Sequence, residues 1–131
     1  MIDTRSESGQ RLAGAYCNRG HGLTEKRELD AALSDLDESV LLDPGYACAC
    51  NNRGRVYSFK RDYDRAIADH DKALQYDPSD VFSWNNRGQA RLRLGDRQGA
   101  IADFRKALEL RPGLPSAHDA LQKLGALTRE P

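Results

Sequence analysis

The sequence feature that most constrains the fold is a repeat with a period of 34 residues. The tripeptide Asn-Arg-Gly begins at Asn18, Asn52 and Asn86, and three further columns hold one residue type at the same period. These columns are Ala32, Ala66 and Ala100; Asp35, Asp69 and Asp103; and Pro44, Pro78 and Pro112. A fixed period of this length indicates an array of similar units, because each unit must bury its apolar face against the next.

Each unit is predicted to be a helical hairpin, with repeats that begin at Ala13, Ala47 and Val81. The expected helices span residues 13–25, 28–42, 47–59, 63–76, 81–94 and 97–110. Asp62 and Asp96 are placed to cap the second helices of their repeats, and the proline column cannot continue a helix. We expect close packing within each hairpin where small residues meet: Gly20 with Ala32, Gly54 with Ala66, and Gly88 with Ala100.

The chain is therefore divided into three repeats with flanking segments. We expect an N-terminal extension at 1–12, repeats at 13–46, 47–80 and 81–114, a capping helix at 115–126 and a tail at 127–131. Ala117, Ala120, Leu121 and Leu124 recur at helical spacing after the third proline. Repeat arrays need such an amphipathic last helix, with its apolar face toward the final repeat.

The repeats resemble a known family. The small-residue columns, the three prolines, Tyr57, Trp84 and Phe104 resemble the tetratricopeptide repeat over residues 13 to 125, and Asn-Asn-Arg-Gly looks like the variant common in bacterial repeats. The resemblance implies an all-α fold of three tandem helix-turn-helix repeats plus a C-terminal capping helix, wound into a right-handed superhelical solenoid. It also implies a scaffold or adaptor whose concave groove binds an extended peptide or a partner helix.

The resemblance selects the positions that line this groove, which here form a polar surface with apolar spots. The candidate residues are Asn18, His21, Asn51, Asn52, Arg55, Phe59, Phe82, Asn85, Asn86, Gln89 and Arg93. Asn18, Asn52 and Asn86 place one amide in each repeat, and an amide both donates to and accepts from a peptide backbone. The alternative is that these amides tie neighbouring helices together, and one side chain can do both.

Some relatives hold chaperone C-termini with lysines, an arginine and asparagines at set groove positions. Those positions here hold Cys17, His21, Asn52, Phe82 and Asn86, so only Asn52 matches and chaperone-tail binding is disfavoured. Other basic residues are expected to have structural roles. The arginine of each Asn-Arg-Gly should pair with nearby acids on a solvated flank. Arg91, where an aromatic is usual, should lay its stem on apolar surface with its head in water.

Composition argues against several classes of protein. Twenty basic and twenty acidic residues cancel, so no global field favours nucleic acid or an anionic membrane. The first thirty residues contain no apolar run typical of a signal peptide, and three cysteines do not form a secreted disulfide framework. We expect a cytoplasmic protein, or a periplasmic one if a leader precedes Met1.

Two alternatives to a peptide-binding scaffold stay open. Cys17, His21 and Cys48 would form a metal or redox site if the second repeat brings Cys48 alongside the first helix. Weak self-assembly is the other, because end-to-end stacking would bury the surface that the capping helix covers. The sequence contains no phosphate-binding loop, no nucleophile elbow and no pair of carboxylates in an apolar setting, so we expect neither catalysis nor a cofactor.

Overall fold

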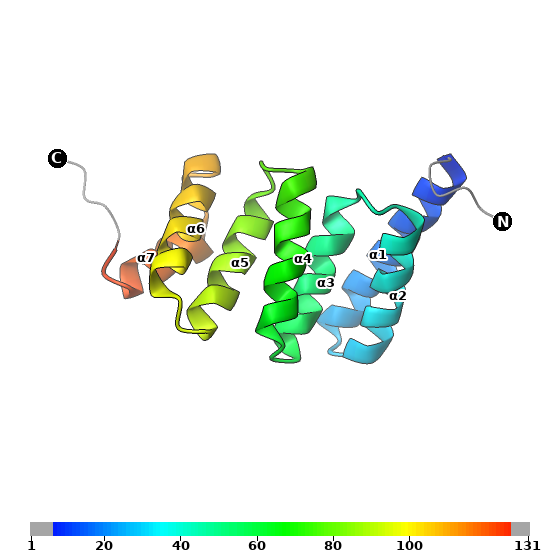
Figure 1. The fold of residues 1–131 in the computed structure, drawn as a ribbon, viewed down its shortest axis with the longest axis horizontal. Coiled ribbons are helices and arrows are strands. Elements are labelled where there is room, and N and C mark those ends of the chain that lie inside the picture. Colours follow the sequence, from blue (N-terminus) through cyan, green and yellow to red (C-terminus); the bar gives the residue numbers. More distant parts are fainter. Residues whose placement is uncertain (1–6, 127–131) are drawn as a thin grey trace.

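A computed structural model of the chain describes residues 7–126, which form seven α-helices and no strand (Figure 1). The helices are α1 (Glu7–Glu25), α2 (Leu29–Leu42), α3 (Ala47–Phe59), α4 (Tyr63–Tyr76), α5 (Val81–Arg93), α6 (Arg97–Leu110) and α7 (Pro115–Lys123). Successive helices pair as antiparallel hairpins, and the hairpins stack into an elongated solenoid whose two ends lie far apart. The all-α prediction is confirmed.

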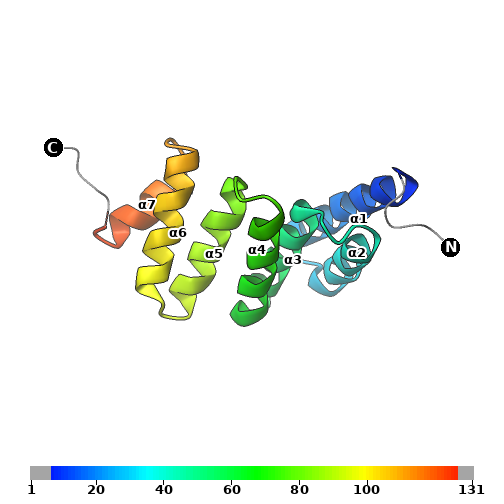
Figure 2. The ribbon, with the colours of Figure 1, turned by 45° about the horizontal axis from the view of Figure 1, so that its top comes forward.

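The solenoid has two rows of helices. Contacts link α1 with α3 and α3 with α5, so the first helices of the three hairpins form one row (Figure 2). The second helices α2, α4 and α6 form the other row, and α7 packs against α6. No helix within residues 7–126 combines the length and the apolar character that crossing a bilayer requires.

The predicted helices α2 to α6 both begin and end within one residue of the observed bounds, whereas α1 begins earlier than predicted. It begins at Glu7, so residues 7–12, predicted to lie in an extension, continue the first helix. No helix-breaking proline interrupts this stretch, and Glu7 in the first turn interacts favourably with the helix dipole. The expected tail at 127–131 and residues 1–6 lie outside the described residues, and α7 ends three residues before the predicted bound of 126.

Aspartate caps and left-handed turns set the helix limits. Asp62 accepts a hydrogen bond from the Arg65 amide and Asp96 accepts one from the Gly99 amide, as predicted. The turn inside each hairpin places one column in the left-handed region: Arg27 (φ 62°), Arg61 (φ 64°) and Gly95 (φ 84°). Glycine adopts this conformation without steric cost, so the third turn is the least strained of the three.

The glycine column permits close packing, but against different partners from those expected. A Cβ on Gly20 would lie 2.7 Å from Leu36 Cγ, and one on Gly88 would lie 2.8 Å from Phe104 Cε1. A Cβ on Gly54 would lie 2.6 Å from His70 Cε1. The glycines therefore make room for the large side chains one turn beyond the alanine column. At Gly20 the carbonyl oxygen of the expected alanine, Ala32, is also among the three nearest atoms, at 3.4 Å.

Two apolar clusters stabilise the array. One joins the first hairpin to α3 and includes Leu36, Ala49 and Val56. The other joins the third hairpin to α7 and contains Phe104 and Leu121. Burial of Ala117, Ala120 and Leu121 confirms that the apolar face of α7 covers the last repeat.

Each hairpin also contains one forked ion pair between the arginine and aspartate columns of the repeat. Arg19 binds both oxygens of Asp35 at 2.7 Å, Arg53 binds Asp69 at 2.9 and 2.8 Å, and Arg87 binds Asp103 at 3.0 and 2.8 Å. Two of these arginines also reach the preceding hairpin. Arg53 donates to Asp37 at 3.1 Å, and Arg87 donates to Asp71 at 2.7 Å.

These pairs revise two expectations. The arginines do pair with acids, but the forked partners are buried: the Asp69 and Asp103 side chains are only 5% and 2% exposed. Arg91 does not simply point its head into water, because its Nη1 donates to both oxygens of Asp103 at 3.1 and 3.0 Å. Bidentate guanidinium–carboxylate pairs in such surroundings fix the relative position of two helices.

Candidate functional site

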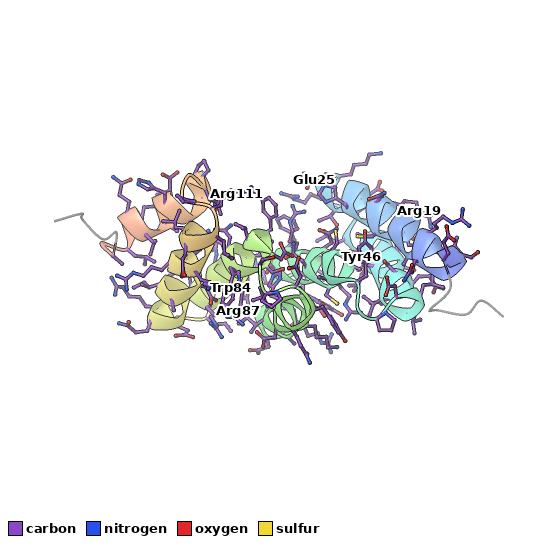
Figure 3. The ribbon with its side chains drawn as sticks, turned by 90° about the horizontal axis from the view of Figure 1, so that it is seen from above. Arg19, Glu25, Tyr46, Trp84, Arg87 and Arg111 are labelled. Atoms are coloured by element: carbon purple, nitrogen blue, oxygen red, sulfur yellow. The ribbon has the colours of Figure 1, made fainter. Side chains whose placement is uncertain are left out.

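A cavity lies against the row formed by α1, α3 and α5. It has a volume of about 720 Å³ and is bounded also by the loop between α4 and α5. Its walls are formed by Asn18, His21, Glu25, Ala47, Cys48, Asn51, Asn52, Arg55, Asp77, Asp80, Phe82 and Asn86. We call this surface the groove. Figure 3 shows the side chains of the array from above, with Glu25 at the end of α1 and Tyr46 just before α3.

The groove brings together seven of the eleven predicted residues: Asn18, His21, Asn51, Asn52, Arg55, Phe82 and Asn86. Gln89 and Arg93 line a second hollow of about 540 Å³, which they share with α7 residues Ser116, Asp119 and Lys123. Phe59 and Asn85 line neither. The predicted surface is thus divided, with one part along α1, α3 and the N-terminal part of α5 and another between α5 and α7.

The asparagines of the groove have unequal surroundings. Asn52 Nδ2 donates to Cys17 Sγ at 3.2 Å and to Cys48 Sγ at 3.7 Å. Asn86 Nδ2 donates to Asn51 Oδ1 at 3.1 Å. The bonds to Cys17 and to Asn51 join first helices of successive hairpins, so the amide nitrogens tie the row together. Asn18, at the end of the series, is exposed, and its side-chain amide has no hydrogen-bond partner among residues 7–126.

Two predicted residues have other partners. Asn85 is 8% exposed and exchanges hydrogen bonds with the Ser116 hydroxyl at 3.1 and 3.3 Å, which joins α5 to α7. Phe59 lies under the Arg27 guanidinium, with 3.9 Å between the guanidinium carbon and the ring centroid. Neither side chain lines the groove, although the Phe59 ring centroid also lies 5.8 Å from the guanidinium carbon of Arg55.

Arg55 joins the first two hairpins inside the groove. Its Nη2 donates to Glu25 Oε1 at 3.0 Å, and its Nη1 lies 3.3 Å from His21 Nδ1. The hydrogen bond and the charge of Arg55 lower the pKa of Glu25. Arg55 therefore already has a carboxylate partner within the protein.

Carboxylates dominate the ionised groups of the wall. The wall contains three carboxylates, those of Glu25, Asp77 and Asp80, and one guanidinium, that of Arg55. Asp80 also caps α5 by accepting from the Phe82 amide and the Ser83 hydroxyl, at 3.2 and 2.7 Å. Sequence reasoning missed Asp77 and Asp80 because they lie in a loop. Tyr46 and Leu114 occupy the equivalents of Asp80, so the repeat gave no sign of it, although an aspartate just before a helix is a capping signal.

An apolar side chain interrupts this polar wall. Phe82, at the start of α5, is 49% exposed, and the Arg111 guanidinium carbon lies 5.1 Å from its ring centroid. A large aromatic side chain on a concave surface is the kind of contact that dominates many protein interfaces. Phe82 is the candidate apolar contact of the groove.

Two cysteines meet at the wall of the groove, where Cys48 lines the cavity and Cys17 lies buried behind it. Cys17 Sγ donates to Cys48 Sγ at 3.7 Å; Cys17 is 1% exposed, whereas Cys48 is exposed. The hydrogen bond from Cys17 lowers the pKa of Cys48 to about 6, and the same bond together with burial raises the pKa of Cys17. One proton is thus retained by the buried thiol, while the exposed sulfur carries the charge.

The predicted third ligand, His21, does not complete a metal site. Its ring lies beside Arg55, a cation, and the part of the chain that the structure describes contains no group of three or more His, Cys, Asp or Glu side chains arranged to hold a metal ion. The alternative of a metal protein built on Cys17, His21 and Cys48 therefore has no support.

Comparison with known proteins places the fold. A family model described as tetratricopeptide repeat matches residues 55–124. The Arabidopsis OM64 TPR domain is 26% identical, with a TM-score of 0.87 over 89% of this chain and 97% of that domain. The second TPR domain of human RPAP3, in complex with an HSP70 peptide, is 27% identical, with a TM-score of 0.83 over 89% and 98%. No curated protein matches the sequence.

Proposed function

The chain belongs to the tetratricopeptide repeat family, and on that basis we propose that it is a scaffold or adaptor that holds an extended segment of another protein in the groove. The observation that carries the proposal is the cavity of about 720 Å³ against the row of first helices, lined by one asparagine from each repeat. The proposal is for binding and not for catalysis. It concerns this surface and does not name the partner.

The amides suit the backbone of a ligand. Asn52 and Asn86 use their nitrogens within the protein, so their carbonyl oxygens are the groups offered to ligand N–H donors. Asn18 offers both amide groups. Contacts of this kind recognise an extended main chain with little dependence on its side chains.

Phe82 and the carboxylates of the groove wall determine which side chains of a ligand bind most favourably. The half-exposed ring favours one apolar ligand side chain, while Glu25, Asp77 and Asp80 outnumber Arg55. A low-dielectric cleft lined by one sign of charge attracts the opposite sign. We therefore propose a ligand that is neutral or basic and carries an apolar residue.

This preference differs from that of the structural neighbour. The RPAP3 domain was solved with the HSP70 peptide SGPTIEEVD, whose last four residues carry four acidic groups, counting the C-terminal carboxylate. In the present groove the single guanidinium is already paired with Glu25 at 3.0 Å. An acidic peptide would meet the carboxylates of Asp77 and Asp80, which form no ion pair among residues 7–126, so chaperone tails are not the proposed ligand.

Partner capture from cell lysate tests the proposal. The double variant Asn18→Ala, Phe82→Ala removes two exposed groove side chains, and Lys72→Ala, Gln75→Ala is the matched control on exposed positions of α4. Wild type and control should capture the same protein. The groove variant should bind that protein at least tenfold more weakly, which corresponds to roughly the 1.4 kcal/mol expected of one interface contact, while its helical circular dichroism is unchanged. Equal capture by the groove variant would reject the groove as the binding site.

A further inference from the structure

The paired cysteines of the groove have an arrangement that peptide binding does not require. Cys17 belongs to α1 and Cys48 to α3, 31 residues apart in sequence, and their sulfurs lie 3.7 Å apart. A disulfide bond is about 2.05 Å long, so the sulfurs must approach by a further ~1.6 Å to form one. The third cysteine, Cys50, is 1% exposed in the core.

The two thiols differ in exposure and in pKa. Cys48 is exposed, and its pKa is lowered by the hydrogen bond that Cys17 donates, with help from Tyr46 and Asn52. Cys17 is buried and keeps its proton. The thiolate is the form of cysteine that reacts, so Cys48 is the nucleophile and Cys17 is the second thiol beside it.

We propose that Cys17 and Cys48 form a peroxide-sensitive thiol pair that is oxidised to an intramolecular disulfide. The Cys48 thiolate attacks one oxygen of hydrogen peroxide or an organic peroxide, the O–O bond breaks, and Cys48 becomes a sulfenic acid as hydroxide or alkoxide leaves. The Cys17 sulfur then attacks the Cys48 sulfur, the S–O bond breaks, and the Cys17 proton leaves with the oxygen as water. Two thiols lose two electrons, which reduce the peroxide.

The disulfide would connect the first two hairpins within the row of first helices. It would also remove the negative sulfur from the groove wall and the acceptor to which Asn52 Nδ2 now donates. The proposal goes beyond peptide binding and does not depend on it, because its chemistry is confined to two residues of this chain.

Alkylation and peroxide treatment of the full chain test the proposal. At increasing pH, the rate at which iodoacetamide modifies Cys48 should reach half of its plateau at least one unit below the value of about 8.5 for an ordinary thiol. Stoichiometric hydrogen peroxide should lower the protein mass by two hydrogens, leave one titratable thiol, and give a tryptic species that links the Cys17 and Cys48 peptides. Dithiothreitol should restore all three thiols.

Variants separate this pair from a general sensitivity to oxidation. Cys50→Ala should still form the disulfide, whereas Cys17→Ala should form none within the chain and should carry Cys48 on to sulfinic acid. An ordinary midpoint for Cys48, a disulfide that joins two molecules, or equal oxidation of Cys48 and Cys50 would overturn the proposal. Each of these results is obtained on wild-type protein, so it does not depend on the folding of a variant or on the identity of a groove ligand.

Discussion

At the scale of the residue, His70 shows how one substitution in a repeat changes local chemistry. It occupies the column of Leu36 and Phe104, is fully buried, and neither ring nitrogen has a hydrogen-bond partner among residues 7–126. Burial, followed by the charges of Arg87 and Arg55, lowers the pKa of His70 to about 3. The ring is therefore a neutral core side chain at physiological pH.

This shift predicts a pH dependence of stability. The unfolded chain binds a proton at His70 below about pH 6.5, whereas the folded chain does not until about pH 3. The free energy of unfolding is therefore highest above about pH 6.5 and falls as the pH drops from there toward 3. At pH 5 the loss should be about 2 kcal/mol. Urea unfolding at pH 7.5 and pH 5 should show it in wild type and in the exposed control His118→Leu, but not in His70→Leu. The same pH loss in His70→Leu would contradict the assignment.

Gly54 is predicted to be intolerant of even one methyl group. Its Cβ would lie 2.6 Å from the buried His70 ring, which has little room to move, so Gly54→Ala should cost about 1–3 kcal/mol. Gly22→Ala is the matched control, because Gly22 lies in α1 with nothing within 4 Å of such a Cβ. That change should stabilise the protein by up to about 1 kcal/mol, since alanine has the higher helix propensity. Thermal unfolding of both variants measures the difference, and a neutral Gly54→Ala would mean that the helices separate easily.

At the scale of the element, the forked ion pairs hold the hairpins together. Asp69→Ala removes the buried partner of Arg53 and leaves that cation with only Asp37, so it should cost about 3 kcal/mol. Asp37→Ala removes the half-exposed partner and should cost less than about 1 kcal/mol. Chemical denaturation of the two variants compares the same residue change at two depths. Equal losses would mean that the fork is not the stabilising contact.

The helices were predictable because the same residue pattern occurs in each of the three repeats. The period placed α3, α4 and α6 at their observed bounds, and the caps at Asp62 and Asp96 follow from a local chemical rule. The start of α1 was missed because residues 7–12 precede the first repeat and have no equivalent column. The arginine and aspartate columns lie 16 residues apart in the sequence. Only the fold shows that the two side chains of each repeat form an ion pair.

At the scale of the whole molecule, α7 completes the last hairpin. Leu121 is 1% exposed and packs in the same cluster as Phe104, so Leu121→Ala should destabilise the protein by about 2–5 kcal/mol. Leu94→Ala, at a position 50% exposed, should cost less than about 1 kcal/mol. Thermal unfolding compares the two. If they were equal, α7 would contribute little to the stability of the array.

The groove was only partly predictable, for a reason that belongs to the whole array. Residues on the first helices, such as Asn18, Asn52 and Phe82, occupy repeat positions that the family resemblance identifies. Asp77 and Asp80 reach the same cavity from a loop, and Gln89 and Arg93 are separated from it by the shape of the solenoid. The charge of the groove therefore emerges only when the hairpins are assembled.

The central claim is that the groove contacts the partner, and site-specific photo-crosslinking tests it most directly. A photoreactive phenylalanine analogue at Phe82 places the reactive group in the groove, and the same analogue at Tyr76, an exposed position of α4, is the control. In lysate, the analogue at Phe82 should yield one dominant crosslinked partner that the Asn18→Ala variant weakens, and the analogue at Tyr76 should not yield it. Crosslinking of the same partner from Tyr76 and none from Phe82 would place the binding surface on the other row of helices and contradict the account.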